Sequence, residues 1–394
     1  GGKGVKQDYD EEIKWFKLAA DQGDAEAQNQ LASLYESGQS GKRNFAKAAK
    51  GFYRAAKKGN ASAQFNLGRV YVMGQGIKKD VAEGISRFTQ AAEQGNTDAL
   101  LSLGLMYQSG VGVKRNYKTA MKYYLQAVNQ GSARGPVSVG LLYQFGKGVK
   151  QDYSLALQYY ILAAERGDAG GQVLAGELYS KGLGVTQDYR TALLYYIQAG
   201  QQGLVRALFH LGEMCLNGFG IEKDDLKAFN FFRLAAKENN ELAQYNLGLC
   251  YEKGCGVEVD YTNAFHWYSL AAQRGNTLAQ YSLGHLYCDS AAGTPDYVEA
   301  AKWYHLAAEK GHAGAQANLG TIYAAGQGVA VDYGKARKWF RLAAKQGEPE
   351  GQYNLGSLYR NGYGVRKNMA EARKWFRLAA EQGHKLAQAV LASL

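Results

Sequence analysis

The sequence predicts an all-α solenoid of helical hairpins, and three observations support that prediction. The glycine at position 23 recurs every 36 residues as far as Gly383, and Asn239 is the one replacement. A fixed period of this length indicates repeat units that are too small to fold alone and bury their apolar faces on their neighbours. Within each period the apolar residues follow helical spacing. The 50 glycines suit many copies of one turn.

The first half of each unit predicts a helix, as residues 312–347 illustrate. Ala315, Leu319, Gly320 and Tyr323 follow one another at helical spacing, which places them on one face. This face is therefore expected to pack inside the hairpin.

A tight turn is expected after the first helix. Gly326 and Gly328 adopt a positive φ at little cost, and Asp332 can cap the next helix by accepting from its first free N–H groups. The equivalent caps are Asp80, Asn116, Asp152, Asp188, Asp224, Asp260, Asp296 and Asn368.

The second half of the unit predicts another helix, which ends at Gly347. Its apolar face comprises Ala336, Trp339, Phe340, Ala343 and Ala344. Most of the 29 tyrosines fall at four repeat positions, those of Tyr323, Tyr333, Trp339 and Phe340, and the five tryptophans all share one of them. Because the same positions recur in every unit, we expect these rings to form the core.

The recurring string A-x-x-x-L-G-x-x-Y-x-x-G-x-G-V-x-x-D-Y-x-x-A-x-x-W-[YF]-x-x-A-A-x-x-G resembles the Sel-1-like repeat, a relative of the tetratricopeptide repeat. The resemblance covers essentially the whole chain. It implies a right-handed superhelix of paired helices and a role as an adaptor in signalling, in envelope or secretion complexes, or in bacterial interactions with host cells. It implies no catalytic residues. A disulfide-bearing branch of the family has cysteines at the positions of Ala20 and Gln28, and no unit of this chain has a cysteine there.

The register predicts one solenoid domain over residues 1–394. A partial unit at 1–23 is followed by full units over 24–383 and a partial unit at 384–394. Residues 2–22 supply only a turn and a second helix, and 384–394 only a first helix. Since both ends lack the polar caps of a solenoid, we expect either a longer natural chain or ends covered by a partner.

One stretch has the spacing of a metal site. His285, Cys288 and Asp289 could direct three ligands from one helix face, although a metal site normally needs further converging groups. The preferred interpretation is an altered turn with a free thiol, and a metal-dependent enzyme centred on His285 is the alternative from a different class. No nucleophile stands in a consistent relation to the histidines, and no phosphate-binding glycine motif occurs. The sequence therefore predicts no enzyme, no cofactor and no metal.

A partner is expected to bind along the first helices. If the positions of Ala27, Leu31, Leu34 and Tyr35 face the core, then positions 26, 29, 33 and 36 face away from it. By resemblance to tetratricopeptide solenoids, those positions line a concave groove. The predicted partner-binding residues are Leu101, Leu105, Gln108, Val137, Leu141, Gln144 and Phe145, followed by Glu177, Phe209, Glu213, Tyr245, Tyr281 and Tyr353. Ordinary packing between units, with solvated charges, is the alternative interpretation.

The predicted groove grades from apolar residues to acidic ones, which suits a protein or peptide ligand with apolar anchors and basic residues. The net charge is +11, and cations such as Lys47, Lys50 and Arg337 concentrate in turns and second helices. No nucleic-acid ligand is expected, because carboxylates occupy the inferred groove. Contact of the basic convex ends with an anionic membrane or an acidic protein stays open.

The function predicted from the sequence is a non-enzymatic scaffold or adaptor that binds a protein or peptide in its concave groove. An immunity or regulatory protein that masks a toxin or an enzyme is the alternative.

Overall fold

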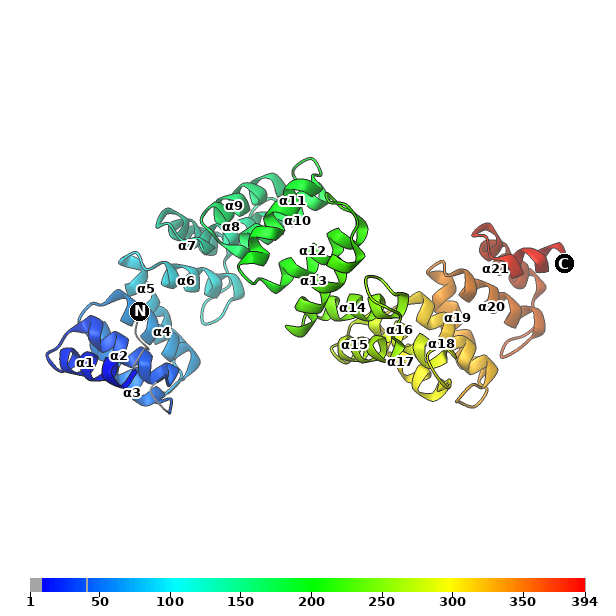
Figure 1. The fold of residues 1–394 in the computed structure, drawn as a ribbon, viewed down its shortest axis with the longest axis horizontal. Coiled ribbons are helices and arrows are strands. Elements are labelled where there is room, and N and C mark those ends of the chain that lie inside the picture. The colour runs from blue at the N-terminus through cyan, green and yellow to red at the C-terminus, as the bar shows by residue number, and fades with distance from the viewer. Residues whose placement is uncertain (1–8, 40–41, 394) are drawn as a thin grey trace. The chain divides into compact units, whose positions relative to one another are not determined.

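The computed structural model describes residues 9–39 and 42–393, which form α-helices joined by short turns and include no strand. The chain divides into two compact units, Gly1–Gln202 and Gly203–Leu394 (Figure 1). The turn predicted within residues 2–8 lies outside the described residues. No helix in the described part is both long and apolar enough to cross a membrane.

Each hairpin consists of an even-numbered first helix and the odd-numbered second helix that follows it. The first helices are α2 (Ala25–Ser37), α4 (Ala61–Met73), α6 (Thr97–Ser109), α8 (Arg134–Gln144), α10 (Ala169–Lys181), α12 (Val205–Asn217), α14 (Glu241–Lys253), α16 (Thr277–Cys288), α18 (Ala313–Ala325), α20 (Pro349–Asn361) and α22 (Lys385–Ala392). The second helices are α1 (Tyr9–Asp21), α3 (Phe45–Lys57), α5 (Val81–Glu93), α7 (Tyr117–Asn129), α9 (Tyr153–Glu165), α11 (Tyr189–Gln201), α13 (Asp225–Lys237), α15 (Tyr261–Gln273), α17 (Tyr297–Glu309), α19 (Tyr333–Lys345) and α21 (Met369–Glu381).

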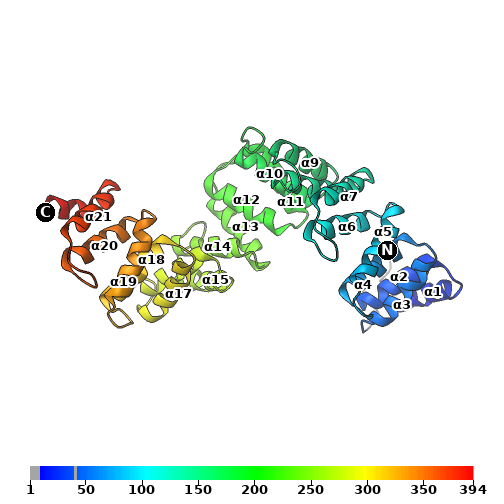
Figure 2. The same cartoon turned by 180° about the vertical axis from the view of Figure 1, so that it is seen from behind.

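Within each unit, a helix packs mainly against the helices before and after it in the chain (Figures 1 and 2). This nearest-neighbour arrangement is that of a repeat solenoid, in which contacts between distant repeats are few. The prediction of an all-α solenoid of helical hairpins is confirmed.

Side-chain caps begin the second helices, as the sequence predicts. The backbone N–H of Lys335 donates to Oδ1 of Asp332 at 2.9 Å, and the N–H of Glu83 donates to Oδ1 of Asp80 at 3.0 Å. The other seven predicted caps accept in the same way. Each cap satisfies at least one of the N–H groups that a helix leaves unpaired at its start.

The turn between the two helices depends on left-handed glycines. Gly326 has a φ of 69° and Gly328 a φ of 68°. A Cβ at Gly328 would lie 2.7 Å from the backbone nitrogen of Val298, so only glycine lets this turn approach the start of α17. At the end of the second helix, Asn239 is the one non-glycine residue with positive φ among the described residues, and asparagine tolerates this region better than most residues.

The core of each hairpin forms where a second-helix ring packs on a first-helix glycine. A Cβ at Gly320 would lie 2.6 Å from the ring of Phe340, and the Phe340 ring is fully buried. The rings at the other three aromatic positions are mostly half-buried. The expectation of one uniform aromatic core is therefore correct for the Phe340 position and too broad for the rest. It is wrong for Trp15, which is 66% exposed on α1.

Several consecutive hairpins are tied together by a glutamine at the start of the first helix. Nε2 of Gln28 donates to the carbonyl of Ala20 at 2.9 Å, and Nε2 of Gln280 donates to that of Ala272 at 3.1 Å. Each carbonyl lies in the last turn of the preceding second helix and also accepts from the N–H of the closing glycine, Gly23 or Gly275, at 3.0 Å. The tie occupies the two positions at which the disulfide-bearing branch has cysteines.

Candidate binding surface on the first helices

Four of the predicted partner-binding residues surround one surface cavity of about 540 Å³. Leu101 and Leu105 come from α6, and Val137 and Leu141 come from the equivalent positions of α8. Phe65 of α4 adds an apolar wall that lies one repeat before Leu101. The structure therefore brings together the most apolar part of the predicted groove.

The four residues differ in how far they face solvent. Leu105 is 58% exposed, whereas Leu101 packs against the core around Tyr124 and Leu141 packs against the core around Tyr160. The expectation that all four point away from the hairpin core is thus wrong for Leu101 and Leu141. A first helix contacts its own second helix and also the next hairpin. Its buried apolar residues therefore extend around more of the helix than a single face.

Polar groups border the cavity. Asp98 and Arg134 are exposed, and no hydrogen bond or ion pair joins either side chain to another described residue. Asp168 also lines the cavity, but its Oδ1 accepts from the N–H of Gly171 at 2.7 Å as the cap of α10. Two charged groups of opposite sign therefore remain available to a ligand.

Gln108 and Gln144 are engaged inside their hairpins. The hydroxyl of Tyr124 donates to Oε1 of Gln108 at 2.8 Å, and that of Tyr160 donates to Oε1 of Gln144. Burial raises the pKa of Tyr124 to about 12. These glutamines satisfy a buried hydroxyl, a role that the sequence analysis missed.

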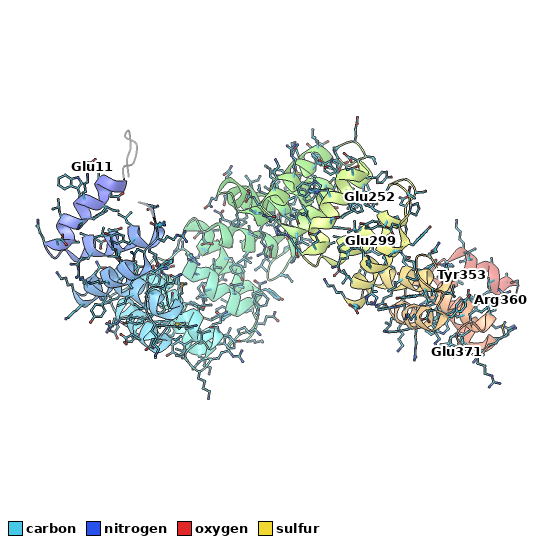
Figure 3. All side chains as sticks on the ribbon, turned by 90° about the horizontal axis from the view of Figure 1, so that it is seen from below. Glu11, Glu252, Glu299, Tyr353, Arg360 and Glu371 are labelled. Atoms are coloured by element: carbon cyan, nitrogen blue, oxygen red, sulfur yellow. The ribbon has the colours of Figure 1, made fainter. Side chains whose placement is uncertain are left out.

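A signal for that role was present in the sequence. Hairpins with tyrosine at the core position have a hydrogen-bonding side chain sixteen residues earlier, as Tyr268 has Glu252. The Tyr268 hydroxyl donates to Oε2 of Glu252, a residue of α14 (Figure 3), at 2.6 Å. Where the core ring is Phe232, the corresponding residue is Leu216.

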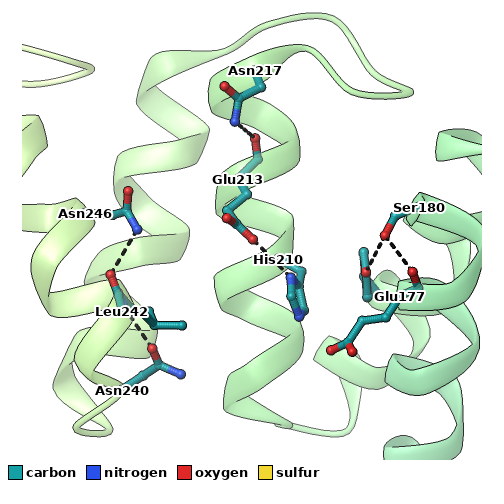
Figure 4. A network of polar contacts seen from close by, with 10 residues as sticks. Glu177, Ser180, His210, Glu213, Asn217, Asn240, Leu242 and Asn246 are labelled. Atoms are coloured by element: carbon teal, nitrogen blue, oxygen red, sulfur yellow. Dashed lines mark hydrogen bonds and ion pairs between the residues drawn. The ribbon is translucent and has the colours of Figure 1, made fainter. Parts of the chain in front are cut away.

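Phe145 is exposed beside the end of α8 but does not line the cavity. The predicted acidic residues lie elsewhere and have partners of their own. Glu177 is buried on α10, where Oγ of Ser180 donates to its backbone carbonyl at 3.0 Å (Figure 4). On α12, Oε2 of Glu213 lies 3.1 Å from Nδ1 of His210 (Figure 4). The Glu177 side chain is therefore not open to solvent, and the Glu213 carboxylate is engaged by His210.

The predicted aromatic anchors share one repeat position, and they pack on the core. Phe209 is 6% exposed, with its centroid 6.1 Å from that of Phe232, so the expectation of an exposed ring is wrong there. Tyr245 and Tyr281 are half-buried at 5.7 and 5.8 Å from the core rings of their own hairpins. Tyr353 of α20 (Figure 3) is half-buried in the same way. The ring at this position packs on its own hairpin, and Tyr281 and Tyr353 also stack on the histidine that caps the next first helix at 4.4 and 4.7 Å, which together explain the partial burial.

The three residues with metal-ligand spacing have separate roles. Cys288 takes the acceptor position and hydrogen-bonds with Tyr304, and burial raises the pKa of its thiol. Oδ1 of Asp289 accepts from the N–H of Ala291 at 2.9 Å in the altered turn, and His285 faces solvent. Among the described residues, no three His, Cys, Asp or Glu side chains are grouped so that they could hold a metal ion.

Comparison with known proteins gives matches along essentially the whole chain. The Sel1 repeat model matches residues 1–24, 25–60, 61–96, 97–132, 138–168, 169–204, 205–240, 242–276, 277–312, 313–348 and 349–384. None of the curated proteins matches the sequence.

Two solved structures resemble the chain in both sequence and fold. A protective antigen of uropathogenic Escherichia coli strains, which displays an SLR fold, is 36% identical with a TM-score of 0.80. That match covers 97% of this chain and 82% of the antigen. A Sel1 repeat protein from Oxalobacter formigenes is also 36% identical, with a TM-score of 0.53, over 55% of this chain and 88% of that protein.

Proposed function

Because this chain belongs to the Sel1-repeat family, we propose that it is a non-enzymatic scaffold that binds a segment of a partner protein across α4, α6 and α8. The cavity bounded by Leu101, Leu105, Val137 and Leu141 is the observation that supports this site. A concave, mostly apolar surface with a few polar groups at its border is the usual form of a ligand site. Repeat solenoids present such surfaces to extended ligands.

The geometry of the cavity suggests how the segment binds. Apolar side chains of the partner would cover Leu105 and pack on the half-buried Leu101 and Leu141. Because Leu105 is exposed in the free protein, covering it removes apolar surface from water. Asp98 and Arg134 stand at the border, so a segment with one basic and one acidic residue beside its apolar anchors is complementary. The exposed border charges favour the correct orientation of the segment more than they raise its affinity.

A single substitution tests the site. Leu105→Asp should weaken partner binding, because a carboxylate would be desolvated against an apolar partner surface. Leu141 is unsuitable for this test because it packs on the Tyr160 core, and a carboxylate there would also destabilise the fold. Leu194→Asp on α11 is the matched control, since Leu194 is 61% exposed and does not line the cavity.

The measurement is quantitative capture of proteins from the native source on the immobilised full chain and on each variant. We expect a set of partners that is retained by the parent and by Leu194→Asp and is lost by Leu105→Asp. Equal capture by all three, with unchanged circular dichroism, would mean that the partner surface lies elsewhere.

A further inference from the structure

Two full hairpins lack an aromatic ring at a second-helix position where the others have one, since Gly51 stands there in α3 and Arg87 in α5. The position of Gly51 is aromatic in eight other units: Tyr123, Tyr159, Tyr195, Phe231, Trp267, Trp303, Trp339 and Trp375. The contacts of Tyr123 show how such a ring packs. Tyr123 stacks on Tyr107 of its own first helix at a centroid distance of 5.7 Å, and it also packs on the core of the preceding hairpin around Phe88.

Gly51 of α3 leaves that space open. Its neighbour on α2 is Ala32, where the following nine units have glycine, and a Cβ at Gly51 would lie 2.7 Å from the Cβ of Ala32. The two substitutions therefore occur together: a larger residue on the first helix and no side chain on the second. The aromatic ring cannot be restored at position 51 while Ala32 is present.

A cavity of about 190 Å³ lies at this place between α1, α2 and α3. Leu31, Ala32, Tyr35 and Gly51 give it an apolar lining. An apolar cavity of roughly 150 Å³ is large enough to hold a benzene molecule. The space is therefore adequate for one aromatic ring, the group that fills the equivalent place in eight other hairpins.

The border of this cavity is cationic. Lys17, Lys47, Lys50 and Arg54 line it, and Asp21 is the one acidic residue among the lining side chains. Nζ of Lys47 lies 5.3 Å from the centroid of the Tyr35 ring. Within the described part of the chain, no carboxylate forms an ion pair with any of the four cations, so their charge is available to an anionic ligand.

We propose that this cavity, termed the Gly51 cavity, binds an aromatic side chain of a partner protein whose neighbouring residues are acidic. The ring enters the space between α1, α2 and α3 and covers the free face of Tyr35, as Tyr123 covers Tyr107. The flanking carboxylates lie against Lys50 and Arg54 at the border. This site is separate from the cavity on α6 and α8, and it does not depend on the function proposed for that surface.

The probe is a fluorescein-labelled peptide with one tryptophan between two pairs of glutamates, titrated with the full chain at about 150 mM salt. Fluorescence anisotropy reports binding. Replacing the tryptophan by leucine, or the glutamates by glutamines, should weaken binding by about tenfold or more, because each change removes one half of the recognition. Absence of binding by the original probe at millimolar protein would overturn the proposal.

Two variants separate the cavity from its charge. Ala32→Gly with Gly51→Tyr restores the pair found as Gly104 and Tyr123, so it should fill the cavity from within and retain every cation. Lys50→Glu with Arg54→Glu keeps the cavity and reverses two border charges. Each double variant should bind the probe about tenfold more weakly than the parent. An unchanged melting temperature checks that the variant is folded.

The matched control is Lys338→Glu with Arg341→Glu on α19, which makes the same change in charge where Trp339 already occupies the ring position. It should bind the probe as the parent does. Unchanged binding by the filled variant, Ala32→Gly with Gly51→Tyr, would show that surface charge alone holds the peptide. Unchanged binding by the charge-reversed variant, Lys50→Glu with Arg54→Glu, would show that the acidic residues of the peptide are not recognised. Either result overturns the proposal, and if the filled variant fails to fold, the charge-reversed variant decides.

Discussion

At the scale of single residues, the core tyrosines show how a buried polar group is accommodated. A tyrosine hydroxyl inside a hairpin needs an acceptor, and the chain supplies one from the last turn of the first helix, as Gln108 does for Tyr124. In the hairpin whose core ring is Phe232, an apolar residue, Leu216, stands at the acceptor position. The two positions are therefore coupled in energy although they lie on different helices.

This coupling gives a double-mutant prediction. Gln108→Leu should lower the free energy of unfolding by about 2 kcal/mol, because it leaves the buried Tyr124 hydroxyl without an acceptor. Tyr124→Phe should cost about 1 kcal/mol. The double variant reproduces the pair of Leu216 and Phe232, so it should recover most of the loss. Urea denaturation of the four proteins checks this, and strictly additive losses would contradict the coupling.

A histidine cap predicts a pH dependence. Nδ1 of His312 accepts from the N–H of Ala315 at 3.1 Å, and burial lowers the pKa of His312 below its ordinary value of 6.5. A lowered pKa means that the unfolded chain binds the proton more readily. The stabilisation is therefore complete above pH 6.5, and it is lost as the pH falls from there toward the lower pKa of the folded state.

His312→Asn is the matched variant for this prediction, since Asn276 caps the preceding first helix in the same way. We expect the variant to lose less stability than the parent between pH 7.5 and 5.5, as measured by urea denaturation, on top of a pH-independent loss from removing the stacking of His312 on Tyr281. A parent and variant with parallel pH profiles would show that His312 does not titrate in this window.

At the scale of the helical hairpin, close contact between a glycine and a ring sets the separation of the two helices. Gly320→Ala should lower the free energy of unfolding by about 2 kcal/mol, because the new Cβ would lie 2.6 Å from the Phe340 ring. Gly334→Ala is the control: this glycine is exposed in the first turn of α19, and alanine there should be neutral or stabilising by up to about 1 kcal/mol. Thermal melts of both variants give the comparison, and equal losses would rule out the steric explanation.

The caps and turns of the hairpin were largely predictable from the sequence, because each depends on residues that are only a few positions apart. The cap at Asp332 and the turn at Gly326 depend on groups that are close in the chain. The burial of Phe209 and the engagement of Gln108 depend on groups across the hairpin, which helical spacing alone does not locate. Solvent exposure was predicted correctly at Leu105, where it depends on the helix itself.

At the scale of the whole molecule, nearest-neighbour packing predicts that a local defect stays local. Helices contact mainly the preceding and following helices within each compact unit. A destabilising change such as Gly320→Ala should therefore lower hydrogen-exchange protection most in α17 to α20, while protection in α3 to α8 should stay near that of the parent. Mass spectrometry of the exchanged peptides measures this, and a uniform loss of protection would instead indicate one fully cooperative fold.

The central claim is that a partner protein covers the apolar surface around Leu105. The most direct test replaces Leu105 by a photo-crosslinking amino acid in the full chain expressed in its native source, with the same replacement at Leu194 as the matched site. We predict covalent adducts with a partner protein from position 105, because its side chain would lie within the covered cavity, and few or none from position 194. Adducts from position 194 alone, or none from position 105 while the protein still captures its partners, would contradict the claim.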